Sequence, residues 1–168
     1  MALYLRQASV DLPPRCPTSP LMKPNYSYCI KVCNDLLQSE LSAVETYHQA
    51  IEKYAGATVT EELRHICLDH AHAAARLAAR VKDMGGEPER AAGAWGSFAT
   101  SVRTTENLYG EESAIEWLQR GEEMTRKQYQ NALLDDDVVT DTKGIIREEL
   151  LPSVIHHIAS LEMLEEAV

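Results

Sequence analysis

Four long segments with apolar residues at helical spacing most strongly constrain the fold of this chain. They cover about residues 25–55, 59–84, 111–134 and 141–166. Apolar residues every three or four positions place one hydrophobic stripe on each helix, and no segment alternates long enough to form a sheet strand. Short links join the outer pairs, and a long connection joins the middle two. The pattern predicts an all-α four-helix bundle with a long crossover, in which we expect a short helix near 97–108.

The first 24 residues differ in composition from the rest of the chain. Five of the seven prolines lie in residues 13–24, and proline lacks the amide hydrogen that helices and central strands use. We therefore predict an extended or disordered leader over 1–24 and one bundle domain over 25–168. Met22 stands at the end of this leader, and we hypothesise that translation starts there.

Charge and composition argue against several classes of function. The formal net charge is −10, with 26 acidic against 16 basic residues, so we expect no binding of nucleic acid or of anionic membranes. No apolar run approaches the ~20 residues of a membrane span, and the N-terminus lacks a signal-peptide core. The four cysteines contain no C-x-x-C pair and fit free thiols in a cytoplasmic protein. A hydrophobic fraction of 45% and an alanine-rich second helix lead us to expect a homo-oligomer.

A glutamate followed seven residues later by a tyrosine occurs twice. Glu40 and Tyr47 lie in the first predicted helix, and Glu122 and Tyr129 lie in the third. Seven residues are about two helical turns, so each pair shares one face. Glu40 borders the apolar stripe, and on the third helix either Glu122 or the adjacent Glu123 does so. A charged carboxylate at such a position needs a partner or a metal ion. The sequence leaves two interpretations open: metal ligands, or carboxylates paired with arginine or histidine from a neighbouring helix.

Candidate partners for these glutamates lie on the second and fourth helices. Asp69 and His72 are three residues apart and share a helix face, so they form either a ligand pair or a solvated polar network. His70 lies closer to the apolar stripe, and we predict that it is a hydrogen-bonded core histidine. His156 is the candidate on the fourth helix, where Ser153 stands in place of a carboxylate. Carboxylate and imidazole together are suitable ligands for iron or manganese.

Pro152 interrupts the fourth helical pattern. A proline inside a helix removes one hydrogen bond and clashes with the preceding turn. The fourth helix therefore either kinks at the centre of the bundle or begins near residue 151. Glu149 could supply the missing carboxylate only if this helix shifts.

Residues 27–165 resemble the ferritin-like superfamily of ferritins, bacterioferritins and rubrerythrins, and in particular a bacterial branch that is a domain of unknown function. The segments that carry the resemblance are "DLLQSELSAVETY", "DHAHAAARLAARVKDMGGEP", "RGEEMTRKQYQNAL" and "LLPSVIHHIASL". The resemblance implies an internally duplicated bundle with a di-metal centre of iron or manganese, which oxidises Fe(II) with dioxygen or peroxide. By position, the implied metal ligands are Glu40, Asp69, His72, Glu122 and His156.

Two other functions stay open at the level of the sequence. Ser153 and Pro152 stand where ligands are expected, which favours a non-catalytic structural or stress-associated bundle with a vestigial metal site. Met84, Met124 and Met163 are candidate soft ligands for haem or a small molecule between the helices, although methionine at helical spacing usually packs in a core. Whether the protein is an enzyme is not decided by these patterns.

Overall fold

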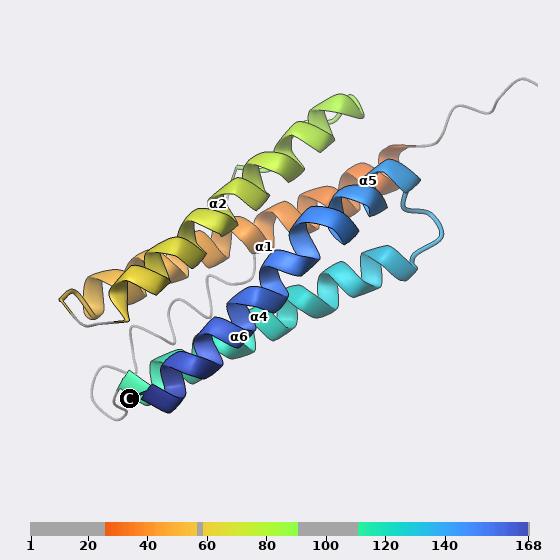
Figure 1. Cartoon of the computed structure of the whole chain (residues 1–168). Coiled ribbons are helices and arrows are strands. Elements are labelled where there is room, and N and C mark those ends of the chain that lie inside the picture. The colour runs from red at the N-terminus through yellow and green to blue at the C-terminus, as the bar shows by residue number, and fades with distance from the viewer. Residues whose placement is uncertain (1–25, 57–58, 91–110, 168) are drawn as a thin grey trace, which may run out of the picture.

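The computed structural model describes residues 26–56, 59–90 and 111–167, and in these ranges it contains helices and no strands. The elements are α1 (Tyr26–Lys53), α2 (Thr60–Asp83), α4 (Glu111–Leu134), α5 (Thr140–Ile145), the π-helix η1 (Ile146–Leu150) and α6 (Leu151–Ala167). The last three follow one another without a break, so the described chain forms four helical rods (Figure 1). The predicted all-α four-helix architecture is confirmed. The predicted leader and the short helix near 97–108 lie outside the described residues.

The observed helix bounds lie within two residues of those expected from the sequence. Glycines mark two of the helix ends: Gly56 follows α1 with φ +91°, and Gly85 follows α2 with φ +82°. A residue in this left-handed conformation commonly ends a helix, and glycine adopts it without steric cost. None of the helices in the described ranges combines the length and the hydrophobicity needed to cross a membrane.

The four rods pack as two antiparallel pairs around a shared core. α1 lies along α2, and α4 lies along α6 (Figure 1). One hydrophobic cluster contains Tyr47, Leu63 and Leu118, and a second contains Leu77, Tyr129 and Ile146. On each of α1, α2, α4 and α6, the members of the two clusters lie on either side of a buried acid or histidine. The bundle therefore has a polar layer between two hydrophobic clusters.

Buried cysteines add to the hydrophobic packing. Cys29, Cys33 and Cys67 are free thiols with little or no exposed surface, as expected from the absence of a disulfide pattern. Burial raises the pKa of Cys33 to about 12, and the neighbouring thiol of Cys29 adds to this effect. The three side chains therefore pack as small hydrophobic residues.

A widened helical turn lies directly before Pro152. The amide of Leu151 donates to the carbonyl of Ile146, five residues back instead of four. Pro152 has no amide hydrogen to give to Glu148, so the regular helical bond at this point is already missing. The rod continues on both sides of the widened turn, and α6 begins at Leu151.

The spacing of buried residues explains why this turn is wide. Ser160 is one of the seven buried positions of the rod, and the other six follow one another at separations of 4, 4, 4, 3 and 4 residues: Thr142, Ile146, Leu150, Val154, His157 and Leu161. A regular helix with 3.6 residues per turn cannot keep three successive spacings of four on one face, because each adds a rotation of about 40°. The π-helix takes up one extra residue and keeps the inner face aligned.

Deleting Glu148 is therefore expected to convert the widened turn into a regular helix and to leave the inner face in place. Glu148 is exposed. When the deletion is made in a Pro152→Ala background, which removes the clash of proline with a regular turn, we expect the free energy of unfolding to change by less than about 1 kcal/mol. The matched control is deletion of Ala75, which is exposed in the regular helix α2. That deletion rotates the rest of α2 by about 100° and should cost about 4 kcal/mol or more. Urea unfolding followed by circular dichroism compares the two; equal losses would contradict this account of the turn.

Candidate metal centre

Four buried polar side chains, one from each rod, meet in the polar layer. They are Glu40 on α1, His70 on α2, Glu122 on α4 and His157 on α6, and none is more than 2% exposed. Charged groups are costly to bury unless they are paired, hydrogen-bonded or bound to a metal. The contacts within this layer show how the fold compensates for burying these four side chains.

His70 lies between the two glutamates. Its Nδ1 is 2.7 Å from Oε2 of Glu40, and its Nε2 is 2.8 Å from Oε1 of Glu122. A neutral imidazole has a single N–H, so in the metal-free protein both ring nitrogens carry hydrogen and the ring is positively charged. Burial by itself lowers the pKa of His70, but the charges of Glu122 and Glu40 outweigh it and hold the pKa well above the ordinary value. A histidine thus supplies the partner that each buried carboxylate needs.

Each tyrosine of the repeated motif donates a hydrogen bond to the glutamate of the other motif. The hydroxyl of Tyr47 donates to Oε1 of Glu122 at 2.7 Å, and the hydroxyl of Tyr129 donates to Oε1 of Glu40. Burial and the adjacent carboxylates raise the pKa of both phenols well above the ordinary value, so both remain donors. These two hydrogen bonds therefore join the two Glu-x6-Tyr motifs to each other and connect α1 to α4.

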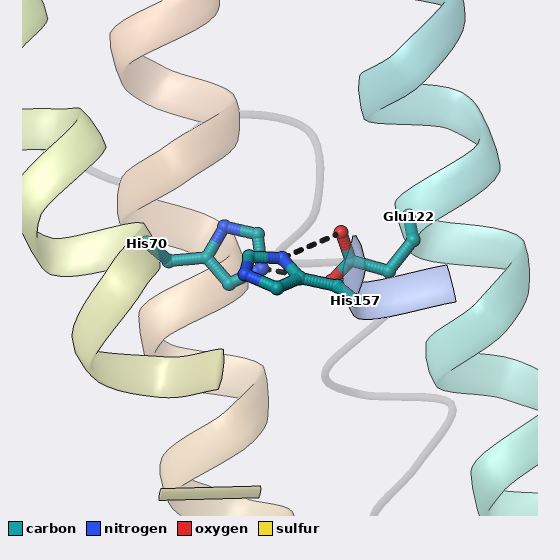
Figure 2. A group of neighbouring side chains, drawn as sticks. All are labelled: His70, Glu122 and His157. Atoms are coloured by element: carbon teal, nitrogen blue, oxygen red, sulfur yellow. Dashed lines mark hydrogen bonds and ion pairs between the residues drawn. The ribbon is translucent and has the colours of Figure 1, made fainter. Parts of the chain in front are cut away.

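His157 links the buried layer to the protein surface. Its Nδ1 is 3.4 Å from Oε2 of Glu122, and its Nε2 is 3.2 Å from Oδ2 of Asp69. The side chain of Asp69 is 44% exposed, so it lies at the edge of the bundle rather than in the layer. Figure 2 shows His70, Glu122 and His157 pointing toward one another. One ligand atom from each of these three residues lies within 4.8 Å of the others.

The structure places the five residues expected as ligands in three different environments. Glu40 and Glu122 lie in the buried layer, and Asp69 lies at its edge in contact with His157. His72 and His156 are exposed, and the structure does not bring them to the cluster. His72 points about 200° around the helix from His70.

On the fourth rod, two nearby residues do not supply the carboxylate ligand that a metal site built from Glu-x-x-His pairs would use. Glu149 lies outside the cluster, where both of its oxygens accept 2.8 Å hydrogen bonds from Arg76 on α2. Ser153 takes the place of a carboxylate, with its Oγ 3.5 Å from Nε2 of His157. The imidazole that reaches the layer is thus His157, which is adjacent to the predicted His156 and rotated from it by about 100°.

The stability of the metal-free protein is expected to fall in acid because of Glu122. Burial alone raises the pKa of this carboxyl, but the charge of His70 and the hydrogen bonds from His157 and His70 lower it to about 2. Ionised Glu122 therefore stabilises the fold above its ordinary value of 4.5, and this contribution is lost as the pH falls toward about 2. The raised pKa of His70 acts in the opposite direction: its contribution is complete below about 6.5 and is lost at alkaline pH.

This dependence is measured by urea unfolding at a series of pH values in the presence of a chelator. Between about pH 5 and pH 2, the free energy of unfolding should fall more for the wild type than for Glu122→Gln. The difference in this free energy between the two proteins should therefore become smaller. A difference that stays constant over this range would contradict the assigned charge state.

The fold and the buried layer together define a class of protein, the helical bundles whose core carries carboxylate and histidine side chains from facing helices. Residues 29–135 match the family described as "Domain of unknown function (DUF2383)", and the chain belongs to this family. The structure is similar to that described as "ferritin like, diiron-carboxylate proteins from Bacillus anthracis str. Ames", with a TM-score of 0.68 and 18% sequence identity. The match covers 86% of this chain and 99% of the other. No curated protein matches this chain. The expected ferritin-like fold is confirmed.

The donors in the buried layer fit a transition-metal ion by their chemistry. Two imidazoles and a carboxylate converge from three different helices, and all three are shielded from water. Nitrogen and oxygen donors of this kind suit iron and manganese. His70, Glu122 and His157 are therefore the residues that could hold a metal ion in this bundle.

Proposed function

We propose that this protein binds iron or manganese in the buried layer and that it acts in metal handling or metal-dependent oxidation. The observation that carries the proposal is the convergence of His70, Glu122 and His157, whose ligand atoms lie within 4.8 Å of one another. Two histidines and one carboxylate form the ligand set typical of non-haem Fe(II) sites with open positions. Bound iron would supply one-electron chemistry with dioxygen or peroxide.

The residues around this ligand set have separate roles. Tyr47 holds one oxygen of Glu122 through its hydrogen bond and so orients the carboxylate. The hydrophobic clusters on either side exclude water from the layer. For a metal ion to bind, His70 gives up the proton on Nε2, which otherwise donates to Glu122. Asp69 is the half-exposed member of the group and offers an acidic contact between solvent and His157.

A specific observation also favours a second candidate, a non-catalytic bundle with a vestigial site. His70 already pairs with both Glu40 and Glu122 at hydrogen-bond distance, so both buried carboxylates have hydrogen-bond partners without any metal. In that case the layer would only specify the packing of the helices. Fold alone does not choose between the two, because one fold hosts many functions.

Metal retention separates these functions. The full chain, purified without affinity tag or chelator, is given Fe(II) or Mn(II) without oxygen and then desalted. We expect the metal to remain with the protein in a fixed ratio, whereas Mg²⁺, which prefers an all-oxygen environment, should be lost. Retention no greater than that of Glu122→Ala would overturn the proposal and favour the vestigial site. Where iron is retained, consumption of dioxygen on exposure to air tests the oxidative role.

Self-association also stays a prediction. Several large hydrophobic side chains are more than half exposed on the described surface, namely Leu68, Leu134, Ile155 and Met163. Light scattering coupled to size-exclusion chromatography measures the mass in solution. A mass near 18.7 kDa would contradict the expected oligomer.

A further inference from the structure

We propose that the centre holds one metal ion rather than two, and that Glu40 acts outside the coordination shell by orienting His70. This inference rests on the proposed function, because it concerns how the same layer binds its metal. It differs from the di-metal arrangement that the ferritin-like resemblance implies. Three observations in the layer carry it.

The first observation is the position of the His70 ring. Its two nitrogens face opposite sides, with Nδ1 toward Glu40 and Nε2 toward Glu122. A neutral imidazole can bind a metal through one nitrogen while the other donates a hydrogen bond. The side toward Glu122 also contains His157, and these three residues form the close donor group. Glu40 is not part of that group, so Nε2 is the nitrogen positioned to bind and Nδ1–H remains with Glu40.

The second observation is that the two glutamates differ in how their oxygens are occupied, although their motifs are alike. Glu40 accepts a hydrogen bond on each oxygen, from Tyr129 and from His70. Glu122 accepts both of its short bonds on Oε1, from Tyr47 and His70. Its Oε2 has only a 3.4 Å contact with His157. The Oε2 atom of Glu122 is therefore the carboxylate oxygen that is available to an ion.

The third observation is the missing second set of ligands. A two-metal site in a bundle uses a Glu-x-x-His pair on each of two helices. Three positions before His70 stands Cys67, and three positions before His157 stands Val154, and both are apolar core positions. Asp69 is the remaining acid in contact with the layer, and it reaches His157 rather than Glu40. Among the described residues, Glu40 belongs to no group of three or more histidine, cysteine or acidic side chains close enough to share a second ion.

These observations assign Glu40 the role of a carboxylate that positions a metal-binding histidine. Such a carboxylate fixes the ring orientation and increases the basicity of the ligand nitrogen. Removing it typically weakens metal binding 10–100-fold without changing the set of ligand atoms. Removing Glu122, in contrast, takes away a ligand atom and changes the coordination itself.

The test is an anaerobic titration of the full chain with Co(II), whose visible absorption reports the number and type of ligands. We expect saturation at one Co(II) per chain. Glu40→Gln should also bind one ion, with an unchanged spectrum and an affinity about 10–100-fold weaker. Glu122→Gln should change the spectrum or abolish binding. Saturation at two ions per chain, or a Glu40→Gln spectrum that differs from the wild type, would overturn the inference.

Two conservative variants keep the test decisive if Glu40→Gln does not fold. Tyr129→Phe removes the hydroxyl that holds Glu40, and Tyr47→Phe removes the one that holds Glu122. We expect Tyr129→Phe to leave the spectrum unchanged, while Tyr47→Phe frees an oxygen of a ligand and alters it. A spectral change in Tyr129→Phe would show that Glu40 binds the metal directly. A wild type that binds no Co(II), Fe(II) or Mn(II) would instead overturn the proposed function.

Discussion

Replacing His70 by alanine should lower the free energy of unfolding of the metal-free protein by about 3–5 kcal/mol. The ring bonds to Glu40 and Glu122 at 2.7 and 2.8 Å, and both carboxylates are almost completely buried. Removing the ring leaves two negative charges together in the core, with the tyrosine hydroxyls and the 3.4 Å contact of His157 with Glu122 as their remaining partners. Because a domain is stable by only about 5–15 kcal/mol, the loss should bring the protein close to unfolding at room temperature.

His72→Ala is the matched control for this measurement. His72 lies two residues further along the same helix and is exposed, so its removal should change stability by no more than about 0.5 kcal/mol. Urea unfolding in a chelator, followed by circular dichroism, compares the two variants with the wild type. Similar losses for both, or no loss for His70→Ala, would show that His70 is not the partner of the buried acids.

Replacing His157 by alanine should have the largest effect on metal binding. This residue belongs to the close group of donors with His70 and Glu122, and its loss leaves a single imidazole in the layer. We expect the affinity for Fe(II) or Mn(II) to fall by more than the 10–100-fold that loss of an outer residue costs. The same variant should be folded, because His157 makes only long contacts of 3.2–3.5 Å with its partners.

The adjacent histidine provides the control for metal binding. His156 is exposed, and His156→Ala should bind metal with the affinity of the wild type. Both affinities are measured by competition with a chromophoric chelator under anaerobic conditions. If His156→Ala loses the metal and His157→Ala keeps it, the metal-binding histidine of the last rod is the one expected from the sequence rather than the one in the layer.

The fold could be predicted from the sequence because its signals are local. The local structure is indicated by helical spacing, by the glycines at 56 and 85 and by the prolines. The observed helix bounds lie within two residues of the expected ones. The inward position of Glu40 and Glu122 was also predictable, since both lie on the apolar stripe of a regular helix. The hydrogen bond from each tyrosine to the glutamate of the other motif was not predictable, because it depends on how α1 and α4 face each other.

The histidines of the layer were harder to identify for two physical reasons. On α2, the choice of His72 followed its spacing to Asp69, while the position of His70 beside the apolar stripe indicated a buried residue. On the last rod, the inward position of His157 depends on the widened turn at η1 (Ile146–Leu150), which takes up one residue. The run of spacings of four from Thr142 to Val154 was the signal in the sequence that could have revealed this turn.

We expect a single metal ion in the buried layer, between His70, Glu122 and His157. A crystal structure of the manganese- or iron-loaded protein, with anomalous scattering measured at the edge of that metal, tests it most directly. One anomalous peak per chain should appear, about 2 Å from Nε2 of His70 and from donor atoms of the other two residues, with Glu40 bonded to the ring and not to the metal. Two peaks in the layer, or a peak at His72 or His156 with none in the layer, would contradict it.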